Sequence, residues 1–296
     1  MLRGEPFDWR AIPVNTVQLL VDVLGPVVVM VAIGALVAQR LGLNTGTLSK
    51  LAYWILGPAF VFNIFSTTTL EAETAAKLVV AGVASVLAAG VAGAVLSPVF
   101  GLRGSAMSAT VMSSAYGNVG NAGLAICVFA LGEDALDRAG VLMVTIMFFG
   151  TLLSVWLGTR QTQSSLKAAL DALVSPMIVA AIIGFLFNVA NLDTPTVIDR
   201  AVSTIAQGLI PVMLLTLGLQ LAMTGSLQFL RSTGVVTIAK LIVAPIIGWA
   251  VAEAFGLTGD DRGVIILQAA MPPAVFCMVL ALEHDLEADR TTNDVV

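Results

Sequence analysis

Long apolar segments constrain the fold of this chain more than any other feature of the sequence. A helix needs roughly 20 apolar residues to cross a bilayer whose hydrocarbon core is about 30 Å thick. Run length and the lack of polar–apolar alternation favour helices over barrel strands. We therefore predict an all-α polytopic membrane protein with nine spans. The predicted spans are 15–38, 48–66, 76–99, 106–130, 139–158, 170–190, 197–222, 232–254 and 263–282.

The composition excludes several classes of soluble protein. Of the 296 residues, 58% are hydrophobic and only 11% are charged, whereas soluble domains have about 45–50% and about 25%. The net charge of −5 provides no basic surface for nucleic acid. An ordinary soluble enzyme, a nucleic-acid-binding protein and a disordered chain are all excluded.

Enzymatic and ATP-driven chemistry also lack their usual residues. The two cysteines, Cys127 and Cys277, lie in apolar segments, and the single histidine is His284. These are too few ligands for a His/Cys metal site. The sequence contains neither HExxH nor a Walker GxxxxGK[ST] motif. We expect a protein that is not an enzyme and has no bound cofactor.

Lysines and arginines near the span ends predict the orientation, because cytoplasmic loops carry an excess of them. The counts on the two sides are close, and we assign the slightly richer side to the cytoplasm, which leaves the N-terminus outside. The cytoplasmic set is Arg40, Lys50, Arg103, Arg160, Lys167, Arg231 and Arg290, and the opposite set is Arg3, Arg10, Lys77, Arg138, Arg200 and Arg262.

The two halves of the sequence match at a nearly constant interval. Chance similarity among apolar residues is an alternative, but proline and glycine anchor the matches. A unit of five spans reverses the orientation of its second copy, which is the inverted repeat typical of secondary transporters. The matches are Pro26–Leu36 with Pro176–Leu186 (offset 150), Pro58 with Pro211 (offset 153) and Phe100–Gly104 with Phe255–Gly259 (offset 155).

The repeat also predicts a tenth span. The fifth span, 139–158, should have a partner near 289–309, but the sequence stops at Val296. Either the protein functions with nine spans or the sequence is truncated, and we favour truncation because half a repeat would leave packing surface unpaired.

Spans 4 and 9 carry residues that interrupt a helix. Span 4 contains three glycines and two asparagines between Gly117 and Gly123, and span 9 contains Pro272-Pro273. An offset of 151 places Asn121 opposite Pro272. Irregular backbone at membrane depth is tolerated where it lines a cavity or is buried in protein, and a half-helix N-terminus favours an anion. The alternative is a pair of packing kinks.

The interrupted segments resemble the auxin efflux carrier family, within the larger group that includes the bile acid–sodium symporters. The segments that carry the resemblance are Gly117–Ala125, Ser175–Pro176, Pro211–Gly218 and Met271–Ala274. It implies ten helices in two inverted repeats, with broken helices crossing in spans 4 and 9. Residues 1–66 and 170–222 would form a scaffold that also mediates a homodimer, and residues 76–158 and 232–296 a transport domain.

The resemblance further implies alternating-access transport of small organic anions, such as auxin-like carboxylates or dicarboxylates, with the lipid bilayer around the protein. The short link at 160–169 resembles bacterial members, which implies the bacterial inner membrane. Ala125 stands where the family often has proline, so the shape of the first break stays open. The implied substrate-binding residues are Gly117, Asn118, Gly120, Asn121, Met271, Pro272 and Pro273.

Other polar residues lie inside the predicted spans. Lys240 could be a counter-charge for an anion, because an ammonium at membrane depth is costly, or it could snorkel to the interface. Asn63 and Gln220 could edge a substrate cavity. Asp22 and Asp171 lie near helix ends, where capping is the favoured role.

A second hypothesis is a sodium-coupled symporter of bile-acid-like amphipathic anions. Ser113, Ser114 and Gln268 resemble the oxygen-rich setting that binds Na⁺ in the bile acid branch. The sequence does not choose between H⁺ and Na⁺ as the coupling ion. A membrane enzyme would need facing acidic residues at depth, and a non-transporting receptor would bind without flux.

Overall fold

The structure, a computed structural model, describes residues 16–42, 44–159, 174–223, 230–274 and 277. Within these ranges every named element is a helix. Five helical segments are long and apolar enough to cross a membrane, and three shorter apolar helices accompany them. The protein is therefore an all-helical, multi-pass membrane protein, as predicted.

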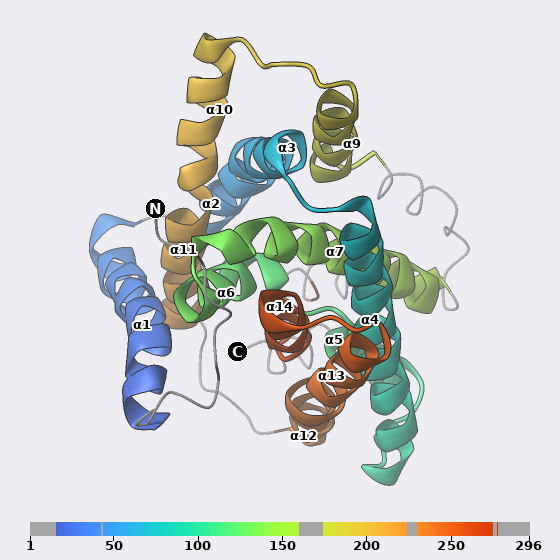
Figure 1. Ribbon diagram of the computed structural model, residues 1–296. Helices are drawn as coiled ribbons and strands as arrows, with labels where there is room; N and C mark the ends of the chain where they lie inside the picture. Colours follow the sequence, from blue (N-terminus) through green and yellow to red (C-terminus); the bar gives the residue numbers. More distant parts are fainter. Residues whose placement is uncertain (1–15, 43, 160–173, 224–229, 275–276, 278–296) are drawn as a thin grey trace.

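The helices follow the predicted spans in order (Figure 1). The predicted start of span 6 with Asp171, the end of span 9, His284 and the place of a tenth span lie outside the described residues. The elements are α1 (Thr16–Leu41), α2 (Thr45–Leu51), η1 (Ala52–Leu56), α3 (Gly57–Thr67), α4 (Ala72–Val99), α5 (Ser105–Ala115), η2 (Val119–Gly123), α6 (Leu124–Leu131), η3 (Glu133–Ala135), α7 (Leu136–Thr159), α9 (Pro176–Val189), α10 (Thr196–Gln207), α11 (Leu209–Met223), α12 (Arg231–Ile238), η4 (Ala239–Val243), α13 (Ala244–Ala254) and α14 (Gly259–Ala269).

The predicted span 197–222 is divided at Gly208 into α10 and α11. Pro211 explains the division, because it has no N–H for the carbonyl of Gln207, four residues earlier. Pro58 in α3 likewise follows the π-helical turn η1. The sequence predicted an uninterrupted helix for each of the spans 48–66 and 197–222, because Pro58 and Pro211 both stand among apolar residues.

Glycines bring two pairs of helices into backbone contact. Helix α1 packs against α11, and a Cβ added to Gly34 would lie 2.2 Å from the Leu215 carbonyl oxygen. Helix α3 packs against α9, and a Cβ added to Gly184 would lie 2.8 Å from the Phe62 carbonyl oxygen. Such close approach is available only to very small residues, a common device in membrane helix packing.

A second group of helices packs around α4 (Figure 1). Helix α4 contacts α5, α7 and α13, and α13 contacts α14. The π-helical turn η2 and α6 lie between this group and α11, because η2 contacts both α11 and α14. The turn η2, which contains Gly120 and Gly123, therefore contacts both groups of helices.

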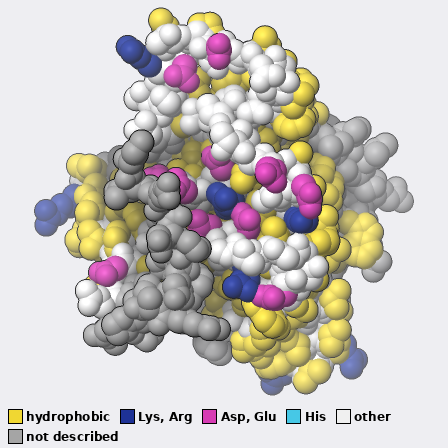
Figure 2. Space-filling model, in the orientation of Figure 1, with side chains coloured by type: hydrophobic (Ala, Val, Ile, Leu, Met, Phe, Trp, Pro, Cys, Tyr) yellow, Lys and Arg dark blue, Asp and Glu magenta, His cyan; other side chains and the backbone are white. Residues whose placement is uncertain are grey.

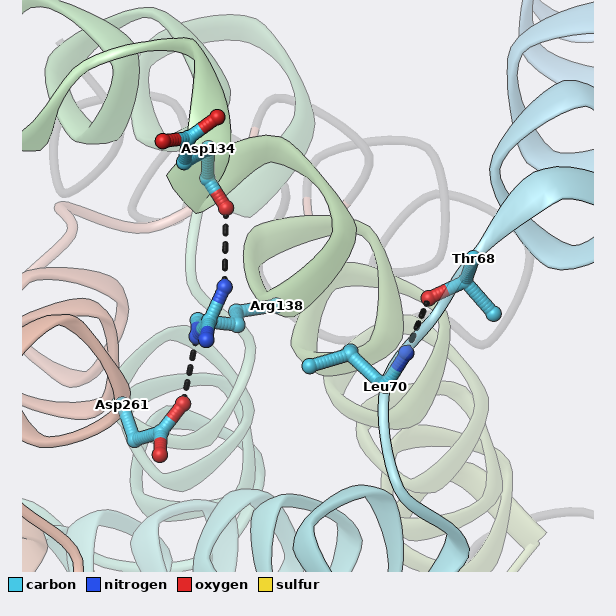
Figure 3. A network of polar contacts seen from close by, with 5 residues as sticks. All are labelled: Thr68, Leu70, Asp134, Arg138 and Asp261. Atoms are coloured by element: carbon cyan, nitrogen blue, oxygen red, sulfur yellow. Dashed lines mark hydrogen bonds and ion pairs between the residues drawn. The ribbon is translucent and has the colours of Figure 1, made fainter. Parts of the chain in front are cut away.

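Charged side chains gather over the middle of one face of the molecule, and apolar atoms surround them (Figure 2). Arg138 of α7 forms an ion pair with Asp261 of α14 and donates to the Asp134 carbonyl oxygen at 2.9 Å (Figure 3). Nearby, the Leu70 N–H donates to the Thr68 hydroxyl at 3.2 Å in the link between α3 and α4 (Figure 3). Arg138 thus ties the first turn of α7 to the first turn of α14.

Candidate functional site

Span 4 is interrupted where the sequence predicts a break. Helix α5 ends at Ala115, and the helical path resumes at Val119. The Asn118 side chain caps the second segment, because its Oδ1 accepts the Asn121 N–H at 3.3 Å. Asparagine suits this position because its side-chain oxygen replaces a missing helix carbonyl.

The break in span 4 pairs with the proline segment of span 9. The Asn118 N–H donates to the Pro272 carbonyl oxygen at 2.6 Å, and the Ala274 N–H donates to the Tyr116 carbonyl oxygen at 2.9 Å. Gly117 and Pro273 face each other between these two bonds as an isolated antiparallel bridge. Prolines have no N–H, so this segment can contribute only its carbonyls and the Ala274 amide. We call this pairing the 117–273 bridge.

The register of the 117–273 bridge differs from the sequence alignment. The paired residues are 156 positions apart, whereas the alignment at 151 placed Asn121 opposite Pro272. The observed interval is close to the 155 found for the loop segments that precede these two spans. Gly117 is therefore the residue that meets the prolines, and Asn121 lies one helical turn beyond.

Part of this site is open and part is sealed. Gly117, Asn118, Met271 and Pro273 are buried, Gly120 and Asn121 are half-buried, and Pro272 is exposed. On the α11 side, the Met213 methyl carbon lies 3.7 Å from a Cβ added to Gly120. The accessible edge of the break thus runs along η2, next to α11.

Lys240 points into the break from the opposite side. It lies in the π-helical turn η4 and is only 4% exposed. Its Nζ donates to the Ala115 carbonyl oxygen at 3.5 Å and lies 2.9 Å from a Cβ added to Gly117. The side chain is thus directed at the end of α5 and not toward a membrane interface.

The three polar residues of the sodium hypothesis have different environments. The Ser114 hydroxyl donates to the Thr110 carbonyl oxygen at 2.7 Å. The Ser113 Oγ and both amide atoms of Gln268 are buried without a hydrogen-bond partner among the described residues. Gln268 touches η2, since its Oε1 lies 2.3 Å from a Cβ added to Gly123. The described part of the chain contains no cluster of three or more His, Cys, Asp or Glu residues suited to a metal.

Asn63 and Gln220 are half-buried. The Asn63 carbonyl oxygen accepts the hydroxyls of Ser66 and Thr67 at the end of α3. Gln220 lies about two helical turns beyond Met213 on α11.

Two residues at the break were missed by sequence reasoning. The Tyr116 carbonyl oxygen accepts both the Ala274 N–H and the Cys277 Sγ–H, the latter at 3.6 Å. The Tyr116 ring lies 2.6 Å from a Cβ added to Gly150, which fixes it against α7. The only sequence signal was adjacency to Gly117, because a cysteine in an apolar segment usually acts as a small hydrophobe.

Comparison with known proteins shows a similarity to membrane transporters. The family model described as "Membrane transport protein", that of the auxin efflux carriers, matches residues 159–296. Over 147 residues, 42% of this chain and 36% of the relative, the sequence is 32% identical to the protein PIN-LIKES 7 of Arabidopsis thaliana. The chain is therefore similar to the auxin efflux carriers, and the family model covers slightly less than half of it.

Other proteins that are similar in sequence to this chain are named as transporters. An uncharacterized transporter of Methanocaldococcus jannaschii is 24% identical over 205 residues, covering 67% of this chain and 65% of that protein. A Rhizobium meliloti protein, whose name proposes malonate as its substrate, is 21% identical over 267 residues, covering 85% of this chain and 81% of that protein. The chain spans slightly less than two thirds of the length of the Methanocaldococcus relative.

Proposed function

We propose that this protein is a secondary carrier of small organic anions that works by alternating access, with the anion held at the 117–273 bridge. The observation that supports this most is the pairing of two interrupted spans through main-chain hydrogen bonds, beside a half-buried Gly120 and Asn121. The substrate-binding residues of the proposal are Gly117, Asn118, Gly120, Asn121, Met271, Pro272, Pro273 and Lys240, with Asn63 and Gln220 further along the path.

The charges around the break favour an anion. The first N–H groups of a helix have no intrahelical acceptor, and η2 begins at the break. Lys240 adds a positive charge on the other side. Neither α5, η2 nor α6 contains an acidic residue. A carboxylate would therefore meet amide donors and an ammonium without a competing negative charge.

The helix packing supports an inverted repeat. Gly34 meets the Leu215 carbonyl, and Gly184 meets the Phe62 carbonyl. Gly34 and Gly184 are equivalent at an offset of 150, and Phe62 and Leu215 are equivalent at an offset of 153, as the repeat requires. In the proposal, α1, α3, α9 and α11 with their flanking turns form the scaffold, and the helices around α4 form the transport domain.

The relative named for malonate supports a small dicarboxylate as the first substrate to test. We further propose the bacterial inner membrane with the N-terminus outside, and a homodimer through the scaffold helices. These assignments follow from the sequence arguments and the similarity to the auxin efflux carriers.

Counterflow in proteoliposomes tests the proposal. Purified protein is reconstituted with malonate inside, and entry of labelled malonate is followed against protein-free vesicles. We expect wild-type counterflow and a clear loss in Asn121→Ala, while Asn191→Gly behaves as wild type, because glycine tolerates the positive φ of this position in the turn after α9. Unchanged counterflow in Asn121→Ala would show that the site is assigned wrongly.

A sodium-coupled symporter of amphipathic anions is the second candidate, and the unpartnered atoms of Ser113 and Gln268 favour it. Their buried oxygens could accept a cation, with Ser114 as a further ligand. Replacing Na⁺ by K⁺ should abolish concentrative taurocholate uptake if this candidate is correct. Uptake that ignores the replacement eliminates it.

A further inference from the structure

We propose that Lys240 is the proton-binding group that couples each anion to one proton. The ammonium form would cross with the anion, and the neutral amine would return without it. This inference rests on the proposed function and adds the coupling ion to it.

The first observation is that Lys240 is buried without a carboxylate. It is 4% exposed, and its Nζ donates to the Ala115 carbonyl oxygen at 3.5 Å. The described part of the chain shows no ion pair to Lys240. A carbonyl oxygen accepts a hydrogen bond from an ammonium or from an amine. The contact to Ala115 is therefore compatible with both protonation states.

The second observation concerns the charges on the elements packed against η4, which are α4, α5, α12 and α13. Glu73 of α4 pairs with Lys77, and Glu253 of α13 pairs with Arg262. Arg231 of α12 lies against Gly101, at the end of that helix away from η4. Helix α5 has no charged residue.

The ionisable group next to the ammonium among the described residues is the Cys277 thiol at the 117–273 bridge. A thiol is neutral in its usual protonation state at neutral pH. No described group therefore supplies a permanent negative charge next to Lys240.

These observations favour a charge on Lys240 that changes with the load. An unpaired ammonium at membrane depth is costly, and release of the proton to water removes that charge. A carboxylate that binds beside Lys240 again favours the protonated form of its amine. The step is the reversible addition of one proton to the Nζ lone pair, and no other bond forms or breaks.

The test uses purified full-length protein in proteoliposomes with a pH-sensitive dye in the lumen and the membrane potential clamped by valinomycin and K⁺. Malonate is added outside, and malonate entry and lumen acidification are recorded together. We expect wild-type entry to acidify the lumen by about one proton per malonate beyond the leak of protein-free vesicles, as the one-site scheme requires.

Two variants of Lys240 are expected to lose different parts of the transport activity. Lys240→Gln should lose the acidification that accompanies each malonate. Lys240→Arg, which stays charged, should retain malonate exchange but lose net uptake, because the unloaded carrier cannot return uncharged. Exchange by Lys240→Arg also shows that this variant is folded. Lys77→Gln, at a surface ion pair, is the matched control and should behave as wild type.

The outcomes separate the two proposals. Wild-type protein that moves no malonate overturns the proposed function and this inference with it. Wild-type malonate entry without acidification overturns the proton coupling alone. Acidification that persists in Lys240→Gln, or net uptake by Lys240→Arg equal to wild type, shows that the proton is bound elsewhere.

Discussion

Asn118 combines two roles at the 117–273 bridge. Its N–H donates to the Pro272 carbonyl oxygen, and its side chain accepts the Asn121 N–H. One residue therefore closes the contact between spans and starts the second half of span 4. The side-chain amide of Asn118 adds no negative charge to the site, which suits an anion.

Asn118→Asp separates the capping role from the charge. Asp caps about as well as Asn, but residue 118 is buried and an ionised carboxylate loses its hydration there, so we expect a folded protein with a lower melting temperature. The added negative charge should sharply reduce malonate counterflow, whereas the neutral capping variant Asn118→Ser should keep much of it. Asn44→Asp, at the exposed cap of α2, is the control for the substitution itself. Counterflow that survives Asn118→Asp would argue against an anion at this position.

Gly123→Ala tests the contact between η2 and α14. The new Cβ would lie 2.3 Å from the Gln268 Oε1 and 3.0 Å from its Cδ. Overpacking of this kind costs about 1–3 kcal/mol, measurable as a lower melting temperature in detergent. Gly234→Ala in α12, with its nearest atom at 3.7 Å, is the control. Equal stability of the two variants would mean that Gln268 has room to move away.

Part of the site could be predicted from individual residues. Gly117, Asn118 and the two prolines can be recognised in the sequence, because glycine, asparagine and proline are unusual inside an apolar span. Lys240 was recognised as costly, but its direction depends on how η4 packs against α4 and α5. The roles of Tyr116 and Cys277 use a main-chain carbonyl and a thiol, which leave no mark in the sequence.

At the scale of elements, the contact between α1 and α11 is made by bare backbone. A Cβ added to Gly218 would lie 1.9 Å from the Val31 carbonyl oxygen, and one added to Gly34 would meet Leu215. These two helices can lie this close only because both contact residues are glycine. The sequence marked both glycines through the repeat and the family motif, but it did not show that they share one interface.

Gly218→Ala should therefore separate two helices. We expect a loss of at least about 1–3 kcal/mol in the free energy of unfolding, with lower yield of folded protein from detergent. Gly234→Ala in α12 is the control, because the nearest atom to its added Cβ is the Phe100 Cε1 at 3.7 Å, and it should be neutral or slightly stabilising. A Gly218→Ala variant as stable as Gly234→Ala would contradict the packing.

The positions of the spans could be predicted because apolar runs and their lengths are local properties. Interruptions were predicted well only where several unusual residues cluster, as in span 4. The division at Gly208 was missed, because it depends on one missing N–H at Pro211. The interval of 156 across the bridge was also missed, because it depends on two spans meeting in space.

At the scale of the whole molecule, the proposal treats the helices around α4 as a body that moves against α1, α3, α9 and α11. The two groups touch at few glycine contacts. One is Gly140 of α7, where an added Cβ would lie 2.6 Å from the Ile64 Cδ1 and 3.3 Å from its Cγ2. This contact would have to break in each cycle.

A disulfide across this contact should stop transport. A Cβ added at position 140 would lie 3.3 Å from the Ile64 Cγ2, one bond from the Ile64 Cβ, so Ile64→Cys with Gly140→Cys brings the two Cβ atoms within reach of the separation of roughly 3.5–4.5 Å that a disulfide needs. We expect oxidation to reduce malonate counterflow to the level of protein-free vesicles and dithiothreitol to restore it.

The matched control joins two helices of the same proposed body. In Gly82→Cys with Thr145→Cys, the new Cβ at position 82 would lie 3.4 Å from the Thr145 Cβ, so α4 and α7 become linked. This pair should leave counterflow unchanged after oxidation. Full activity of the oxidised Ile64–Gly140 pair would show that the two bodies do not move relative to each other.

The two main-chain hydrogen bonds between span 4 and span 9 have a mechanical consequence. They join a non-helical segment of the first half of the chain to a non-helical segment of the second half. In the proposed transport cycle the two segments would therefore move together, and an anion bound at the 117–273 bridge would move with both of them.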